Sequence, residues 1–264
     1  MRNKSLRYFL GFIILFAIFL SIYFSGILLF VSCVIFIITA MIEYRRMYEV
    51  KGVKVHFLLP EIFGGIFSYI FIFNNELQDF LSIIFLVGAF VMAFLITIIR
   101  NKKPYVETTM STVTAILFIF CGLHIIKLCE IFPKNYEIIS IIIYFSAVLI
   151  GDYIASKIGP KYKKIYIAKE ISPNKTLIGA IANLVGTCTL CLFLPYSTTI
   201  NLVVGCVISI FAQIGDLTLS TIKRDIGIKH SSNLFFDYGG IFDRIDAFIF
   251  SAPAMYYCLL IISG

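Results

Sequence analysis

Long apolar runs, separated by short polar loops, recur along the whole of this 264-residue sequence. A helix needs about 20 mostly apolar residues to cross the hydrocarbon core of a bilayer, and these runs are that long. The composition agrees, because 60% of the residues are hydrophobic, only 14% are charged, and the mean hydropathy is +0.97. Soluble domains lie outside this range. We therefore expect an all-α, polytopic integral membrane protein that forms one domain over residues 1–264.

The apolar runs predict about nine transmembrane helices. The first run, residues 6–42, is too long for one span and divides at a tight turn over residues 21–26. The nine predicted spans are approximately residues 6–22, 25–43, 57–73, 78–99, 109–129, 137–156, 177–194, 200–219 and 246–262. The first five fall within residues 1–135, and the last four, within residues 136–264, carry the polar motifs described below.

The distribution of basic residues supports this layout. Of the 22 Lys and Arg residues, 20 fall on one side of a nine-span arrangement, and only Lys127 and Lys134 fall on the other. Cytoplasmic loops of membrane proteins carry the excess of Lys and Arg. We therefore expect the N-terminus in the cytoplasm and the C-terminus outside, with the protein in the cytoplasmic (inner) membrane. The net charge of +7 is then explained by these loops, and no nucleic-acid partner is expected.

One polar stretch, residues 215–246, lies between the last two apolar runs. It contains four aspartates that could hold a metal ion and four basic side chains, namely Asp216, Asp237, Asp243, Asp246, Lys223, Arg224, Lys229 and Arg244. Charged groups at a membrane border are costly unless they have a function. The pair Gly239-Gly240 supplies backbone freedom for a turn or for the close approach of a ligand. Such a stretch fits a divalent cation that holds a polyphosphate.

The spacing within this stretch brings several side chains together. Asp216, Ser220 and Lys223 are four and three residues apart, so they share one face of a helix. Asp243 and Asp246 are three residues apart and share a face at the start of the last span. A simpler explanation is that these carboxylates cap the helix and form ion pairs with nearby arginines.

Two further polar elements are predicted on the same side of the membrane. Asp152, near the end of the sixth span, needs a cation or a water-filled cavity, unless it emerges into the cytosol beside Lys157. Ser172, Lys175 and Thr176 belong to a Ser-Pro-Asn-Lys-Thr element that opens the seventh span. Polar side chains there can cap the helix, and a helix N-terminus beside a lysine suits a phosphate, although such helix starts are common.

Together these motifs resemble the signature of the phosphatidate cytidylyltransferases, also called CDP-diacylglycerol synthases. The resemblance rests on Ser-x-x-Lys-Arg at Ser220, on Lys229, on Gly239-Gly240, and on Asp-Arg-x-Asp at Asp243. Gly215-Asp216-Leu217, the Ser-Pro-x-Lys-Thr element and Asp152 match as well. The chain departs from the family pattern at Ile178, at His230 and at Phe236-Asp237-Tyr238.

The resemblance implies that CTP and phosphatidate react to give CDP-diacylglycerol and pyrophosphate in phospholipid biosynthesis. It implies Mg²⁺ held by Asp216, Asp243 and Asp246, and leaves open an accompanying monovalent cation. The implied catalytic residues are Asp216, Lys223, Arg224, Asp243, Arg244 and Asp246. The implied substrate-binding residues are Asp152, Ser172, Lys175, Thr176, Ser220, Lys229, Gly239 and Gly240. The resemblance also implies membrane lipid around the protein, and it leaves open whether the protein forms a homodimer.

Three alternatives remain at this point. A CTP-dependent kinase of polyprenol or phytol type would transfer the γ-phosphate instead, but it must activate a hydroxyl, and only His230 is a candidate base. A degenerate member of the family would bind its ligands without catalysis. A transporter is a poor fit, because its charges usually lie in the middle of helices in two matched halves, and this sequence has no internal repeat.

Overall fold

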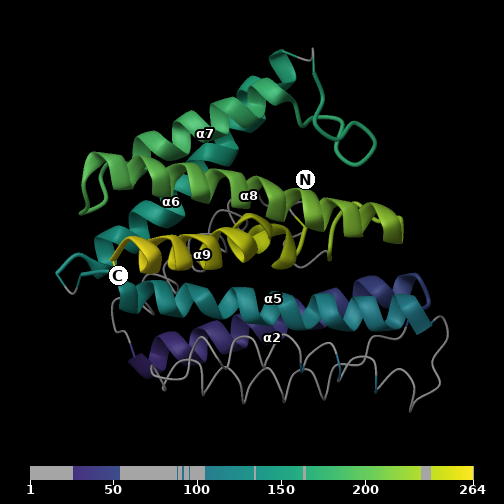
Figure 1. Cartoon of the computed structure of the whole chain (residues 1–264). Helices are drawn as coiled ribbons and strands as arrows, with labels where there is room; N and C mark the ends of the chain where they lie inside the picture. Colours follow the sequence, from purple (N-terminus) through teal and green to yellow (C-terminus); the bar gives the residue numbers. More distant parts are fainter. Residues whose placement is uncertain are drawn as a thin grey trace, which may run out of the picture. The chain divides into compact units, whose positions relative to one another are not determined.

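The computed structural model describes residues 26–53, 105–133, 135–162, 165–232 and 239–263, together with residues 88, 91 and 95. The regular structure of these residues is helical, and they contain no strand, only an isolated bridge between Tyr166 and Thr176. The α-helices in chain order are α2 (Gly26–Val50), α5 (Tyr105–Ile131), α6 (Glu137–Ile158), α7 (Leu177–Cys191), α8 (Thr198–Ile226) and α9 (Phe242–Ser263) (Figure 1). A short 3-10 helix, η1 (Gly159–Lys161), follows α6.

Each of these six helices coincides with a predicted span. By length and composition, α6, α8 and α9 could each cross a membrane, and shorter apolar helical segments cover Met110–Ile125 and Leu177–Cys191. The all-α membrane character is therefore confirmed. The predicted spans at residues 6–22 and 57–73, and nearly all of the span at 78–99, lie outside the described residues. The number nine and the orientation of the termini stay predictions.

The chain divides into two compact units. The first unit comprises Met1–Glu49, Val53–Ile119 and His230–Phe242, and the second comprises Val50–Gly52, Phe120–Lys229 and Asp243–Gly264. The expectation of a single membrane domain stays a prediction.

An aromatic cluster around Tyr44 joins the elements of the first unit. The Tyr44 ring lies edge-on to Phe118 of α5, with ring centroids 5.8 Å apart, and is tilted against Phe242 at 5.6 Å. The Tyr44 hydroxyl donates a hydrogen bond to the backbone carbonyl of Ser111, at 3.2 Å. Tyr44 is fully buried, and this cluster therefore anchors α2 to α5 and to Phe242.

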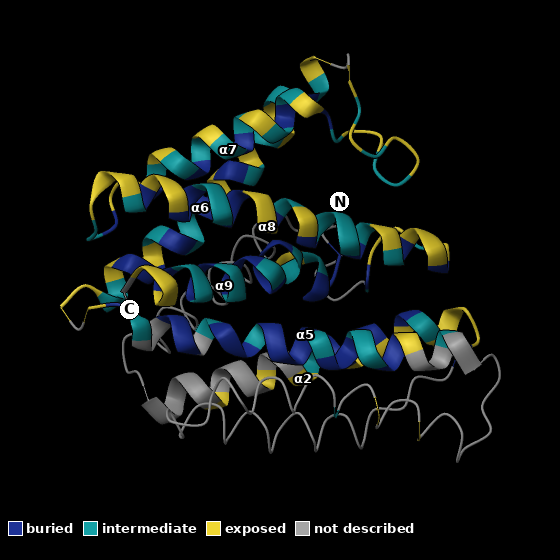
Figure 2. Ribbon diagram, in the orientation of Figure 1, coloured by how far each residue is buried: buried dark blue, intermediate teal, exposed yellow. Residues whose placement is uncertain are grey.

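Helix α7 packs against both α6 and α8 in the second unit (Figure 1). Small residues permit this close packing, because a Cβ atom at Gly151 would collide with Thr187, and one at Gly205 would crowd Cys188. Helices α7 and α8 carry exposed positions along their length (yellow in Figure 2). Many of these are apolar, for example Val185. Apolar side chains on the outside and polar ones between the helices are what a lipid environment favours.

Candidate active site

A row of polar side chains follows the inner face of α8. Ser209, Gln213, Asp216, Ser220 and Lys223 are spaced alternately by four and three residues, so they form one stripe on the helix. All five are buried or half-buried, whereas apolar residues of α8, such as Ile210 and Ile214, are exposed. We call these five residues the polar stripe. The predicted common face of Asp216, Ser220 and Lys223 is therefore observed, and two further residues extend it into the apolar part of the helix.

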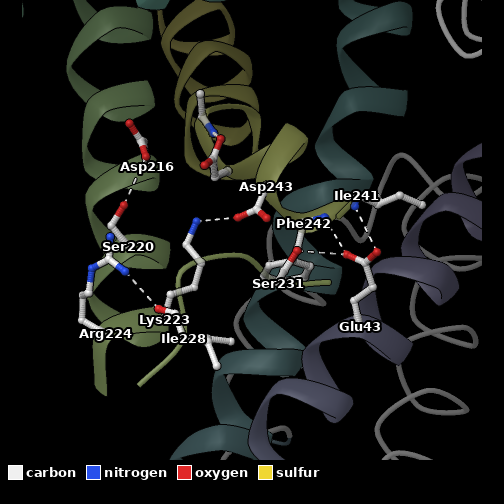
Figure 3. A network of polar contacts seen from close by, with 12 residues as sticks. Glu43, Asp216, Ser220, Lys223, Arg224, Ile228, Ser231, Ile241, Phe242 and Asp243 are labelled. Carbon is white, nitrogen blue, oxygen red and sulfur yellow. Dashed lines mark hydrogen bonds and ion pairs between the residues drawn. The ribbon is translucent and has the colours of Figure 1, made fainter. Parts of the chain in front are cut away.

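Lys223 pairs with Asp243 in the first turn of α9. Its Nζ lies 2.6 Å from Asp243 Oδ1, and the two side chains are only 11% and 9% exposed (Figure 3). Burial of two opposite charges is costly unless each satisfies the other at short range, as here. The structure therefore joins the two ends of the polar stretch, residues 215–246, through an ion pair.

A second pair links α8 to the segment that precedes α7. Lys175 Nζ lies 2.5 Å from Asp216 Oδ2, and Ser220 donates to Asp216 Oδ1 at 3.4 Å. Lys175 is held there by the start of α7, where Thr176 is the N-cap and accepts a hydrogen bond from the Gly179 amide at 3.2 Å. The capping residue is thus Thr176.

Asp152 faces the same region from α6 and is fixed by an amide. Asn183 Nδ2 donates to Asp152 Oδ1 at 2.8 Å, and Asn183 Oδ1 accepts from Ser209 at 2.7 Å and from Thr187 at 3.3 Å. Gln213 in turn donates to Ser209 Oγ at 3.1 Å. This network connects α6, α7 and α8 and satisfies polar groups that would otherwise be costly inside a membrane.

Asp246 completes the polar region from α9. Its carboxylate accepts a hydrogen bond from the Ala247 amide at 2.9 Å. The backbone of α9 can approach α8 there because Gly215 has no side chain, and a Cβ atom would collide with the Asp246 carbonyl oxygen. The charges of Asp152, Asp216 and Asp246 act on one another, and Lys175 and Lys223 partly offset them. Carboxylates from three helices therefore converge within electrostatic range.

The other predicted site residues lie in different surroundings. Arg224 is exposed and donates to the carbonyl oxygens of Ile171 and Ile228, at 3.1 and 3.0 Å, so it ties the end of α8 to neighbouring backbone. Lys229 and Arg244 are exposed. Ser172 is half-buried, and its backbone carbonyl accepts a hydrogen bond from the Lys175 amide. Gly239 adopts φ +83°, and Gly240 is buried.

No role was predicted for four residues that make polar contacts in the structure. Asn183 and Gln213 are amide side chains inside apolar runs, and Ser209 continues the 4–3 spacing upstream of Asp216. The amide side chains inside apolar runs and the continued spacing would have identified Asn183, Gln213 and Ser209. Glu43, the last residue of the second predicted span, is buried and accepts four hydrogen bonds.

The carboxylate oxygens of this region suit a hard metal ion, although the described side chains are not grouped closely enough to hold one. Carboxylate oxygens are the ligands that Mg²⁺ prefers. The four aspartates described above, Asp152, Asp216, Asp243 and Asp246, carry more negative charge than Lys175 and Lys223 offset. Among the residues that the structure describes, no group of three or more His, Cys, Asp or Glu side chains stands close enough to hold an ion. Asp216 and Asp243 are each occupied by a lysine, with which a metal would compete.

Apolar helices with converging charges define a class, namely membrane proteins with a polar region between their helices. Comparison with known families is more specific. The sequence profile of the Cytidylyltransferase family matches residues 5–262, and the chain belongs to this family.

Relatives of this chain occur in several bacteria. A phosphatidate cytidylyltransferase of Aquifex aeolicus is 34% identical over 141 residues, which are 53% of this chain and 54% of the relative. A phosphatidate cytidylyltransferase of Bacillus subtilis is 27% identical over 238 residues, 85% of this chain and 86% of that one. An uncharacterized protein of Escherichia coli, YnbB, is 28% identical over 216 residues, 78% of this chain and 72% of that one. This chain therefore spans about half the length of the Aquifex relative and most of the Bacillus one.

Proposed function

We propose that this protein transfers CMP from CTP to phosphatidate, which gives CDP-diacylglycerol and pyrophosphate. The observation that carries the proposal is the two lysine–aspartate contacts, half-buried Lys175–Asp216 and buried Lys223–Asp243, in a chain of the Cytidylyltransferase family. The printed names of the Aquifex and Bacillus relatives support this choice of substrates.

The chemistry needs charge neutralisation more than a strong base. A phosphate monoester is already an anion, so its oxygen can attack the α-phosphorus of CTP while the bond from that phosphorus to the leaving pyrophosphate breaks. Two anionic reactants must be brought together, and positioned cations lower the free energy of that encounter. Lys175 and Lys223 would exchange their aspartates for phosphate oxygens. Arg224, Lys229 and Arg244 would add positive charge at the rim.

A divalent cation, for which we propose Mg²⁺, would be held by Asp216, Asp243 and Asp246. When bound, it would supply charge cancellation on the triphosphate. The presence of three carboxylates from α6, α8 and α9 in one polar region, Asp152, Asp216 and Asp246, supports a cation there. Asp152, kept in place by Asn183, would form the wall of the site toward α6.

The same proposal includes the membrane topology. Nine spans with a cytoplasmic N-terminus would expose the polar stretch, residues 215–246, to cytosolic CTP in the inner membrane, and phosphatidate would enter sideways from the bilayer. Single cysteines at positions 169 and 134, in a variant without its seven native cysteines, should separate the two sides. A membrane-impermeant maleimide added to intact cells should label position 134 and spare position 169. The reverse pattern, or labelling of both, would contradict this topology.

The decisive experiment follows the label of CTP in purified protein with phosphatidate in mixed micelles. Label from the α-phosphate should enter the lipid and label from the γ-phosphate should leave in pyrophosphate. Asp243→Asn and Lys223→Ala should abolish the transfer while the protein stays inserted. Lys157→Ala is the matched control, because Lys157 is exposed and lies over the Tyr153 ring. Transfer of the γ-label to a lipid would instead favour a kinase, and full activity of both site variants would contradict the site.

A further inference from the structure

Glu43 of α2 is a buried carboxylate that binds only neutral groups among the residues that the structure describes. Its side chain accepts four hydrogen bonds, two on each oxygen. Figure 3 shows the partners Ser231, Ile241 and Phe242. Oε1 accepts from the Ser232 hydroxyl at 2.7 Å and from the Ile241 amide at 3.1 Å. Oε2 accepts from the Ser231 hydroxyl at 3.2 Å and from the Phe242 amide at 3.0 Å. The residue is 4% exposed.

These bonds satisfy the backbone at the start of α9. The first amide groups of a helix have no partner within the helix, and Phe242 begins α9. A negative charge is favourable at this end because the amide dipoles point their positive ends toward it. Glu43 therefore acts as a cap for α9, although it lies 199 residues before Phe242.

The glycine pair of the polar stretch has a structural explanation in the same contacts. A Cβ atom on Gly240 would overlap the Glu43 carboxylate and the Ser231 hydroxyl, so only glycine leaves room for them. Gly239 adopts φ +83°, a conformation that is costly for residues with a side chain. The first glycine makes the turn and the second accommodates Glu43, so the pair is explained without a ligand.

We propose that Glu43 is a positioning residue for the CMP transfer, an inference that rests on the proposed function. Asp243 follows Phe242 directly in the chain, and its carboxylate pairs with Lys223. Because Ile241 and Phe242 lead directly into Asp243 along the chain, hydrogen bonds to their amides fix where α9 begins. Glu43 itself touches no reacting atom in this proposal. It acts through the backbone of residues 241–242.

Glu43→Gln tests this with almost no change in shape. One backbone amide points at each oxygen of the carboxylate, so a glutamine in either orientation sets its NH₂ group against an N–H group. The amide therefore cannot satisfy both Ile241 and Phe242. We expect kcat to fall roughly 10–100-fold, the range that a displacement of about 1 Å at a catalytic group produces, while KM for CTP stays within about threefold. Glu49→Gln, an exposed change on the same helix, should keep wild-type kcat.

Hydrogen exchange supplies a readout that does not depend on activity. In Glu43→Gln the amides of Ile241 and Phe242 should exchange at least about tenfold faster, while peptides of α7 keep their protection. Unchanged exchange, unchanged kcat, or a rise in KM alone would overturn the role of Glu43. A wild-type protein that forms no CDP-diacylglycerol would instead overturn the proposed function.

A milder variant covers the case in which Glu43→Gln does not fold. Ser232→Ala removes one of the four hydrogen bonds and leaves both backbone bonds in place. It should lower kcat by no more than about threefold, and the exchange rate of the Ile241 amide should rise by a similarly small factor. A larger loss of activity in Ser232→Ala, with the exchange of Ile241 and Phe242 unchanged, would contradict a role through the backbone.

Discussion

The buried pair of Lys223 and Asp243 can be tested by separating its effect on stability from its effect on catalysis. Both side chains are about nine-tenths buried and the two charged atoms are 2.6 Å apart. Removal of one partner leaves an uncompensated buried charge, which costs about 3–5 kcal/mol. We therefore expect Lys223→Met and Asp243→Asn each to lower the free energy of unfolding by about that amount.

The double variant distinguishes the two roles of the pair. With both charges removed, no buried charge is left alone, so the loss of stability should be much less than the sum of the two single losses, with a coupling of at least about 2 kcal/mol. Activity should not return, because the positive charge for a phosphate and the carboxylate for a cation are both missing. All three variants should transfer α-label at less than about 1% of the wild-type rate.

The unfolding should be followed by far-UV circular dichroism in a detergent titration with SDS, since the chain has no Trp. The exposed pair Arg45–Glu49, with side chains 56% and 48% exposed, is the control, and its coupling should stay below about 1 kcal/mol. A similarly small coupling between Lys223 and Asp243 would refute the buried ion pair. A double variant that regains activity would refute the catalytic role.

Three further perturbations test the rest of the site. Asn183→Leu leaves Asp152 without its amide donor and should lower the free energy of unfolding by about 1–3 kcal/mol in the same titration, whereas the exposed change Ile181→Leu should leave it within about 0.5 kcal/mol. Gly215→Ala forces a methyl group against the Asp246 carbonyl and should cost about 1–3 kcal/mol; no loss would mean that α8 and α9 are farther apart than the structure has them. Chelation with EDTA should stop α-label transfer and added Mg²⁺ should restore it, and transfer that survives chelation would contradict the metal proposal.

The sequence predicts those features that depend on neighbouring residues. The start of α6 at residue 137 and of α7 at residue 177 agree with the predicted spans, because a change from polar to apolar residues marks both. The predicted end of the eighth span at residue 219 is seven residues short of Ile226. The hydropathy falls in the last turns of α8, which carry Lys223 and Arg224, but the backbone remains helical. It ends at Gly227, whose φ of +83° stops the helix.

Features that depend on distant partners could not be predicted from local patterns. Glu43 has the appearance of a charge at the end of a span, and its partners lie 188 to 199 residues further along the chain. Asn183 likewise meets Asp152 across 31 residues and Ser209 across 26. α9 begins at Phe242, four residues before the predicted start, where Glu43 binds the free amides. Only tertiary packing brings such groups together.

Two of the departures from the family signature, Ile178 and His230, are not members of the lysine–aspartate pairs. Every residue of those pairs, Lys175 with Asp216 and Lys223 with Asp243, matches the signature, whereas Ile178 and His230 belong to neither. A chain that had lost its reaction would no longer need to hold two lysines and two aspartates in contact at the ends of apolar helices, because isolated buried charges are costly and apolar replacements are usually tolerated. The retention of both pairs, together with the cap that Glu43 provides directly before Asp243, therefore favours an active enzyme over a degenerate relative.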